Sequence, residues 1–529
     1  MNAYDAVVVG GGHHGLVAAI ELADHGRQVL LCESRPEVGG AVADRTIGGF
    51  VVDEFSAFHP LAAASPVIQG LGLDKHGLQW ARSERVVAHI GRPDDTSGAL
   101  LHADPTHTAA RLDADAPGDG AAWLELVDSF ASLKDPLLDA LLLSWPPVRH
   151  APKLAKAVGA TNLLDFVRFA LLPVEQLSVE RFRGRAARDL LSGNAMHADI
   201  PPEAPGSGVY GWIMTMLAQD VGFPTPVGGA SALARSLRSR AEAAGVEIRT
   251  GTPVVRIRAE HARASGVDLA SGEFIKAPVV IADTSAPMLY GTLLEDVPAG
   301  LRARMERFTW DLPTIKINLG LSGAMPWTAE AGRSTSVVHV GGGHRDLVRW
   351  SADLGSGRIP EHPFALVGQM TSTDPLRSPA GTESMWVYSH LPRGVTDDDG
   401  TEHLIRNCER MLEEFAPGWR DLVVERWDQT PRSLEDSNAN LGEGAVGGGT
   451  MQLFQQAFWR PATGLGGPRT FLPGLYLGSA AIHPGGGVHG GAGHMAARAA
   501  LADSALAGKV RGALERRVRR SIDTTLPRF

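Results

Sequence analysis

Three glycines near the start of the chain have the spacing that a nucleotide phosphate requires. Gly10, Gly12 and Gly15 follow an apolar run, residues 4–9, and precede an apolar pattern of helical period, residues 16–23. Gly10 permits a tight turn, Gly12 lets the backbone approach a pyrophosphate, and Gly15 lets a helix pack closely on a strand. The free N–H groups at the start of that helix attract phosphate. This spacing predicts one half of a dinucleotide-binding site.

An acidic residue completes this unit. Residues 28–32 have the pattern of a second strand, and Glu33 stands at its carboxyl end, 18 residues after Gly15. A carboxylate at that place accepts hydrogen bonds from a ribose and disfavours a 2′-phosphate. Strand, glycine loop, helix, strand and acid together predict a βαβ unit of the α/β class.

The segment after the acid indicates the kind of nucleotide. Residues 33–40 resemble the extension that two-domain flavoproteins of the glutathione-reductase and amine-oxidase type carry after the ribose acid. Paired glycines let the chain pass beside the pyrophosphate of FAD, and an arginine pairs with phosphate. Ala41 stands where many relatives have an arginine. The FAD contacts predicted in this segment are Ser34, Arg35, Gly39, Gly40 and Ala41.

A second glycine-rich loop lies near the other end of the chain. Residues 473–479 have the pattern of a strand, residues 483–494 form the loop, and residues 495–501 are strong helix formers. The start of such a helix stabilises negative charge on a reduced flavin. His483 and His489 flank this loop, so we predict that they orient a substrate or tune the charge of the flavin. The alternative is that both histidines only cap loop carbonyls.

Together the two loops resemble the bacterial-type phytoene desaturase and carotenoid oxidoreductase family of FAD proteins. The match is closest to its pyridine nucleotide-disulfide oxidoreductase domain-containing and retinol-saturase-like branches. The matching segments are residues 7–19 and 483–490, with 226–230, 251–257 and 279–283 between them. The resemblance implies non-covalent FAD held between both ends of the chain. It assigns further cofactor contacts to His13, His14, Val254, Gly478, Ser479, Gly487, Val488 and His489.

The order of these motifs predicts the architecture. We expect an α/β protein, α+β overall, in which a Rossmann-like FAD-binding domain of the glutathione-reductase/amine-oxidase type carries an inserted substrate domain with a mixed or antiparallel sheet. The predicted FAD domain comprises residues 1–90, 226–300 and 441–529. The substrate domain comprises residues 91–225 and 301–440, with lid or membrane-facing helices. Another glycine run, residues 340–346, lacks the third spaced glycine and a following helical pattern, so we interpret it as a loop and predict no NAD domain.

Composition excludes several classes of protein. The chain has 529 residues, of which 44% are hydrophobic and 21% are charged, as is typical of soluble globular proteins. A net charge of −9 argues against nucleic acid as a partner. Cys32 and Cys408 form no C-x-x-C pair, and no histidine belongs to a metal-binding motif, so we expect a reducing compartment and no metal site. Because no leader or transmembrane pattern is visible, we expect a cytoplasmic protein.

Two segments are basic in this acidic chain. Residues 149–188 contain eight Lys and Arg against three acids, and residues 509–520 contain six against one. Within the first segment, apolar residues share one face of a helix that ends before Pro173: Leu163, Phe166, Val167, Ala170 and Leu171. Such segments can rest on an anionic membrane. The interpretation we favour for the first is a helix that packs between domains with a solvated charged side, and for the second a solvated terminal helix.

These observations predict an FAD-dependent oxidoreductase. The resemblance implies that it desaturates or saturates a carbon–carbon bond of a hydrophobic, isoprenoid, carotenoid-like or acyl substrate by hydride transfer with flavin N5. Three alternatives stay open, namely a flavin amine oxidase, an isomerase that uses reduced flavin, and an interaction protein with structural FAD. The expected partners are a hydrophobic small molecule and, peripherally, a membrane. The oligomeric state is not predicted.

Overall fold

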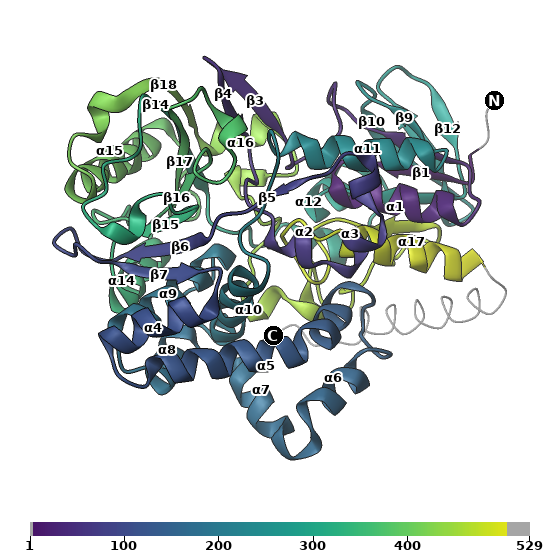
Figure 1. Cartoon of the computed structure of the whole chain (residues 1–529). Coiled ribbons are helices and arrows are strands. Elements are labelled where there is room, and N and C mark those ends of the chain that lie inside the picture. The colour runs from purple at the N-terminus through teal and green to yellow at the C-terminus, as the bar shows by residue number, and fades with distance from the viewer. Residues whose placement is uncertain (1–3, 505–529) are drawn as a thin grey trace.

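Two large β-sheets organise the chain, and each has its own layer of helices (Figure 1). The computed structural model describes residues 4–504. A five-stranded sheet lies on the right of Figure 1 and a seven-stranded sheet on the left.

The five-stranded sheet is parallel and collects strands from three distant parts of the chain. Its order is β19 (Leu475–Leu477), β13 (Val279–Ala282), β1 (Ala6–Val9), β2 (Val29–Cys32) and β9 (Glu247–Arg249). Every residue of β1 and β2 is buried, as expected for central strands that are covered on both faces. One face packs against α1 (His13–Asp24), α11 (Ser231–Ala243) and α17 (Gly491–Ser504). The other packs against a three-stranded sheet of β10 (Val254–Glu260), β11 (Arg263–Leu269) and β12 (Phe274–Lys276).

The seven-stranded sheet is mixed. Its order is β18 (Val423–Gln429), β14 (Thr314–Leu321), β17 (Glu383–His390), β16 (Ala365–Gln369), β15 (Val337–Val340), β6 (Arg85–Ile90) and β7 (Ala99–His102). All neighbouring strands are antiparallel except β15 and β6, which are parallel. One face packs against α15 (Asp398–Phe415).

A helical layer covers the other face of this sheet around Trp123, Phe130 and Trp212. It contains α4 (Pro105–Asp115), α5 (Asp119–Leu142), α8 (Val174–Arg181), α9 (Arg185–Ala195), α10 (Ser207–Asp220) and α14 (His344–Gly355). Two further helices, α6 (Ala151–Val158) and α7 (Leu163–Leu171), project from it at the bottom of Figure 1. Between residues 4 and 504, no helix is both long enough and apolar enough to cross a bilayer.

Short elements connect the two halves. The hairpin of β3 (Asp44–Ile47) and β4 (Phe50–Asp53) lies between the two sheets in Figure 1. The others are α2 (Pro60–Ala64), α3 (Pro66–Gly70), β5 (Trp80–Ala81), β8 (Thr225–Pro226), α12 (Ala286–Met288), α13 (Ala299–Met305) and α16 (Pro431–Ser437).

The predicted fold class is confirmed, because a parallel sheet with covering helices joins a mixed sheet. The domain limits stay a prediction. One strand departs from them: β6 falls inside the predicted segment 1–90 but pairs within the seven-stranded sheet.

The prediction for residues 340–346 is wrong in one respect, because α14 begins at His344. Leu347, Trp350 and Leu354 are buried at helical spacing, which is the pattern that was missed. At the start of this helix the carboxylate of Asp346 accepts a hydrogen bond from the backbone N–H of Gly343.

Candidate functional site

The first glycine loop joins β1 to α1 where side chains have no room. The φ angle of Gly10 is +100°, which favours glycine. A Cβ atom on Gly15 would lie 2.1 Å from the carbonyl oxygen of Gly10, and one on Gly12 would lie 2.5 Å from Oδ2 of Asp283. The tight turn and the close helix packing predicted for this loop are therefore present. Because Gly12 has no side chain, a ligand can approach its backbone closely.

The carboxylate of Glu33 is held at the edge of this loop. It is 6% exposed and accepts hydrogen bonds from the backbone N–H of Gly11 at 2.7 Å and of Arg35 at 2.8 Å. The hydroxyl of Ser34 donates to it at 3.2 Å. These contacts place the acid where the pattern predicts a ribose.

The paired glycines lie against the first loop. The N–H of Gly39 donates to the carbonyl of Gly11 at 2.8 Å, and a Cβ atom on Gly40 would lie 3.0 Å from Cα of Gly12. The guanidinium of Arg35 contacts the carbonyl of Gly40 at 3.3 Å and Glu54 at 3.6 Å. The extension therefore passes beside the phosphate loop, as the resemblance implied.

The following residue, Ala41, continues this segment. Its carbonyl accepts a hydrogen bond from the hydroxyl of Ser56 at 2.7 Å. That contact joins the glycine pair to residues 56–61.

The two ends of the chain meet at this site. A ring nitrogen of His13 lies 3.2 Å from the carbonyl oxygen of Gly487. A Cβ atom on Gly493 would lie 1.9 Å from the carbonyl oxygen of His14, so α1 and α17 are packed backbone to backbone. Val488 is buried in the core between the five-stranded sheet and its helices. The two predicted loops are thus neighbours, although more than 470 residues separate His13 from Gly487.

Four histidines of the two loops, His13, His14, His483 and His489, are neutral at pH 7; the last three are buried and His13 is partly exposed. Burial lowers the pKa of His13 to about 3, of His483 to about 3 and of His489 to about 4, and it lowers the pKa of His14 well below its usual value. The rings of His14 and His489 lie 4.8 Å apart. These rings therefore add no positive charge to the site.

His483 and His489 differ in what they contact. Both ring nitrogens of His489 are engaged by its own loop, because Nδ1 accepts from the N–H of Gly491 at 3.0 Å and Nε2 lies 3.2 Å from the carbonyl of Gly485. His483 stacks on Trp145 at 3.8 Å between ring centroids, and its Nε2 has no hydrogen-bond partner within residues 4–504. The capping alternative fits His489, while the unpaired Nε2 leaves His483 able to contact a ligand. Both catalytic roles stay predictions.

Gly478 and Ser479 follow β19. A Cβ atom on Gly478 would lie 2.9 Å from Cβ of Ala496, so this glycine lets α17 approach the sheet. The hydroxyl of Ser479 donates to the carbonyl of Thr284 at 2.6 Å and accepts from the N–H of Ala481 at 3.1 Å. Its predicted contact with FAD has to compete with these two bonds.

Val254 begins β10 and is half-buried. The segment that leads into it lies beside the ribose acid, because the N–H of Thr252 donates to the carbonyl of Glu33 at 2.8 Å. Val254 therefore follows closely after a segment that is hydrogen-bonded to Glu33, and its predicted contact with FAD stays a prediction.

The sequence patterns missed Asp283 as a site residue. It follows β13, the neighbour of β1, and its Oδ2 accepts a hydrogen bond from the N–H of Gly15 at 2.8 Å. Burial raises its pKa to about 7. Its place at the carboxyl end of a central parallel strand is the signal that could have identified it.

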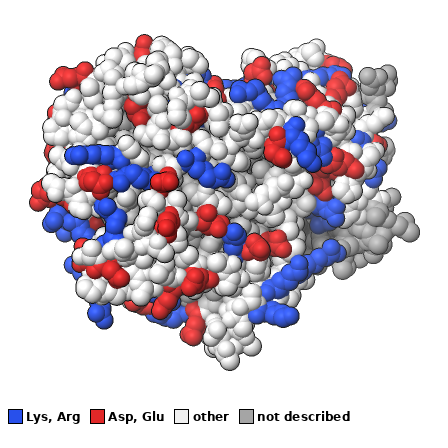
Figure 2. All heavy atoms as spheres, viewed as in Figure 1, with Lys and Arg blue, Asp and Glu red and all other residues white. Residues whose placement is uncertain are grey.

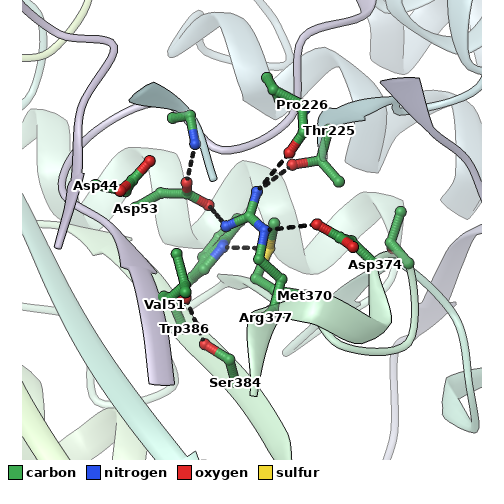
Figure 3. Close-up of polar contacts among 12 residues, drawn as sticks. Asp44, Val51, Asp53, Thr225, Pro226, Met370, Asp374, Arg377, Ser384 and Trp386 are labelled. Carbon is green, nitrogen blue, oxygen red and sulfur yellow. Dashed lines mark hydrogen bonds and ion pairs between the residues drawn. The ribbon is translucent and has the colours of Figure 1, made fainter. Parts of the chain in front are cut away.

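A second missed group joins the two halves of the molecule. Figure 3 shows Arg377 between Asp53 and Asp374, which contact its guanidinium at 2.8 Å and 3.3 Å. Arg377 also donates to the hydroxyl of Thr225 and the carbonyl of Pro226. All three charged side chains are buried.

The two carboxylates of this group also hold the glycine motif at residues 226–230. Asp53 accepts from the N–H of Ala230 at 2.9 Å, and Asp374 accepts from the N–H of Gly228 at 2.7 Å. Asp374 and Arg377 follow β16 and precede β17 of the seven-stranded sheet, whereas Asp53 ends β4. The motif is therefore fixed by one charge from the connecting hairpin and one from the seven-stranded sheet.

Lys316 is the fourth charge in this network. It lies on β14, and its ammonium donates to the carbonyl oxygen of Asp53 and lies 5.6 Å from the centre of the Trp386 ring. Burial lowers its pKa to about 8. A lysine inside an apolar strand is the sequence signal that was overlooked.

These residues fit FAD. Gly12 and Gly40 form a cradle of backbone atoms, because a Cβ atom on Gly12 would meet Asp283 and one on Gly40 would meet Gly12. The buried carboxylate of Glu33 stands where the pattern predicts a ribose. The second loop contacts His13 through the carbonyl oxygen of Gly487, and α17 begins shortly after it, at Gly491. Among residues 4–504, no group of three or more His, Cys, Asp or Glu could hold a metal ion.

Comparison with known proteins agrees with this geometry. The chain is 27% identical over 94% of its length to pyridine nucleotide-disulfide oxidoreductase domain-containing protein 2 of Mus musculus, of which 94% is covered. It is 23% identical to a subunit of the limonene dehydrogenase of Castellaniella defragrans over 95% of both chains. It is 26% identical to a zeta-carotene-forming phytoene desaturase of Myxococcus xanthus over 86% of both chains. The resemblance inferred from the two glycine loops is confirmed.

A solved structure and a family model extend the comparison. An oxidoreductase of Methanosarcina mazei has the same fold, with a TM-score of 0.59 and 17% identity over 94% of this chain and 99% of that one. Residues 15–501 match the model of the flavin-containing amine oxidoreductases. The chain therefore belongs to the flavin-containing amine oxidoreductase family, and it is an FAD-dependent oxidoreductase.

Proposed function

We propose that the protein desaturates or saturates a carbon–carbon bond of a hydrophobic substrate. The observation that carries this proposal is the position of two apolar side chains of residues 56–61, Phe58 and Leu61. Leu61 lies against the second loop, because a Cβ atom on Gly487 would be 2.9 Å from its Cδ1 atom. Phe58, in the same segment, lies 6.3 Å from Phe223 and 6.1 Å from Trp386 between ring centroids. Apolar side chains beside the second loop suit a substrate without charged groups.

The names of the relatives support the same class of substrate. Limonene and zeta-carotene, named for two of them, are unsaturated hydrocarbons. A hydrocarbon offers no group for ion pairing, so its binding depends on apolar burial and on shape. The neutral state of His483 and His489 is compatible with such a substrate, because neither ring needs a counter-charge.

The chain's own residues have defined tasks in this proposal. The backbone at Gly12 and Gly40 and the carboxylate of Glu33 would hold FAD. When bound, FAD would supply the two-electron centre that exchanges a hydride with a substrate carbon. Leu61 and Phe58 would keep water away from the reacting carbon and position it. His483, through its unpaired Nε2, would orient the substrate or a water beside it.

The test is anaerobic spectroscopy of the purified FAD enzyme with separate substrates. Limonene, a linear polyene and an aliphatic amine are added in turn, and products are identified by mass spectrometry. Desaturation predicts that a hydrocarbon bleaches the flavin band and yields a product lighter by two hydrogens. Saturation predicts that only chemically reduced enzyme reacts, with a product heavier by two hydrogens.

Other outcomes would replace the proposal. Bleaching by the amine alone, with a carbonyl product, would identify an amine oxidase. A product of unchanged mass formed only by reduced enzyme would identify an isomerase. If FAD raises the melting temperature but no compound reacts in either redox state, the cofactor is structural.

A further inference from the structure

Helix α7 has an apolar face that no other part of residues 4–504 covers. Its exposed residues lie within an arc of about 100° at the usual 100° per residue: Leu163, Leu164, Val167 and Leu171. Leu164 is 83% exposed and Val167 is 48% exposed. The opposite side packs inward, where Phe169 meets Trp212 at 5.2 Å between ring centroids. The favoured interpretation as a domain-packing helix therefore accounts for only one side of α7.

Further exposed apolar side chains occur in two neighbouring stretches of the chain. Val148, in the connection that leads to α6, is 69% exposed. Phe458 is 54% exposed, and its ring lies 5.0 Å from that of Trp145. Large apolar side chains rarely stay exposed in groups unless they meet a partner.

Basic residues accompany this apolar face. We call residues 148–171 the tip; they contain four Lys and Arg and a single acid, Asp165, in a chain whose net charge is −9. Lys153 and Lys156 are exposed on α6. In Figure 2 the place that Figure 1 gives to α6 and α7 is a white projection, with blue Lys and Arg side chains on its right and red Asp or Glu side chains on its left.

We infer that the tip docks onto the surface of an anionic lipid bilayer. Apolar side chains next to lysines on short amphipathic helices match a bilayer, because the former enter the acyl boundary while the latter meet the negative headgroups. A soluble partner that is acidic and wholly polar would satisfy the lysines but would leave the leucines and Val167 without an apolar environment. Docking would be peripheral, since no helix between residues 4 and 504 can span a bilayer.

A chain of aromatic contacts connects the exposed Phe458 to the second glycine loop. Phe458 contacts Trp145, and Trp145 stacks on His483 at 3.8 Å between ring centroids. When the protein is docked through the tip, its second glycine loop would therefore lie close to the bilayer, where hydrophobic molecules dissolve. The docking itself does not depend on the proposed reaction.

The test uses the full-length FAD-loaded chain and sedimentation with vesicles. One set contains phosphatidylcholine with one-third phosphatidylglycerol, and the other contains phosphatidylcholine alone. We expect binding to the first set, weakened by added salt, and at least tenfold weaker binding to the second. Replacing Lys153→Gln and Lys156→Gln together should weaken binding to anionic vesicles by about fivefold for each lysine.

A matched pair of variants tests the apolar face. Leu164→Glu with Val167→Glu should reduce binding at least about tenfold, since two acids would enter the bilayer interface. Leu376→Glu with Val424→Glu makes the same chemical change at residues that are 67% and 55% exposed elsewhere, and it should leave binding unchanged. Flavin absorbance and melting temperature of each variant show that it is folded.

Five outcomes would overturn the inference, four with the full-length chain and one with a truncated chain. The first two are equal binding to neutral and anionic vesicles, and an equal loss of vesicle binding in both pairs of variants. The third is that neither set of vesicles binds the protein. The fourth is a dimer, seen in analytical ultracentrifugation, that the Leu164→Glu and Val167→Glu variant abolishes. The basic segment at residues 509–520 lies outside the described residues. If removal of residues 505–529 abolishes binding while the tip variants retain it, the tip is not the docking surface.

Discussion

The carboxylate of Asp283 accepts a hydrogen bond from the backbone N–H of Gly15, the third glycine of the phosphate loop, at 2.8 Å. The same carboxylate stands 2.5 Å from the place that a Cβ atom of Gly12 would occupy. A titratable group therefore lies directly beneath the loop that is predicted to bind the pyrophosphate.

The pKa of Asp283 makes stability and FAD affinity depend on pH. Burial raises this pKa from its usual value of 3.8 to about 7, so the folded protein retains a proton that the unfolded chain has lost. The contribution of Asp283 to stability is greatest below pH 4, falls as the pH rises to about 7, and then stays low. Asp283→Asn keeps an acceptor without the charge, so it should be more stable than the unchanged protein by about 2–4 kcal/mol at pH 8 and equal to it at pH 4. Urea unfolding at both pH values measures this.

FAD binding provides a second measurement on the same variant. Negative charge on Asp283 repels a pyrophosphate, so Asp283→Asn should bind FAD more tightly than the unchanged protein at pH 8 and equally at pH 5. Fluorescence titration of the apoprotein gives the two dissociation constants. A ratio that stays constant from pH 5 to pH 8 would show that Asp283 does not titrate in this range.

The buried ion pairs of Arg377 should be costly to break singly. Arg377→Met leaves Asp53 and Asp374 without their cation, and the expected loss in stability is about 3–5 kcal/mol. Removing one of these acids as well, in Arg377→Met with Asp53→Asn, should restore part of the loss, because one fewer buried charge is unpaired. Thermal unfolding of the single and double variants measures the coupling. Simple additivity of the two losses would contradict it.

Substitution at the first loop should weaken FAD binding. Gly12→Ala places a methyl group 2.5 Å from Oδ2 of Asp283, so the loop backbone has to shift and FAD affinity should fall at least about a hundredfold. Gly355→Ala is the matched control, because a Cβ atom there meets nothing within 4 Å and the residue ends a helix. It should leave FAD affinity unchanged. Equilibrium dialysis and circular dichroism measure FAD affinity and folding.

Substitution of Phe58 should weaken binding of the substrate more than binding of the cofactor. Phe58→Ala removes a ring that packs near Phe223 and Trp386, so we expect KM for a hydrophobic substrate to rise about tenfold. The flavin spectrum should not change, since the residue belongs to no predicted FAD contact. Equal losses for a hydrocarbon and for a small polar electron donor would instead indicate a general disturbance of the fold.

Local patterns were enough to identify the nucleotide half-site. Gly10, Gly12, Gly15 and Glu33 lie in one βαβ unit, where short chain connections and steric limits on the backbone leave few alternatives. The second glycine loop was also recognised, but its position beside His13 was only implied by resemblance. Helix α14 was not predicted, because it begins directly after three consecutive glycines, residues 341–343, which are typical of a loop; only the helical spacing of Leu347, Trp350 and Leu354 indicates it.

The sequence by itself determined the parallel βαβ core, the two glycine loops that we predict to hold FAD and the membership of the family. Only the tertiary structure decided which distant residues complete the site. Asp283 lies 268 residues from Gly15, and Arg377 lies 324 residues from Asp53, so no local pattern connects them. Burial makes these pairings necessary, because a buried charge without a hydrogen bond or an opposite charge costs several kcal/mol of free energy. Which residue supplies the partner depends on the packing of distant segments.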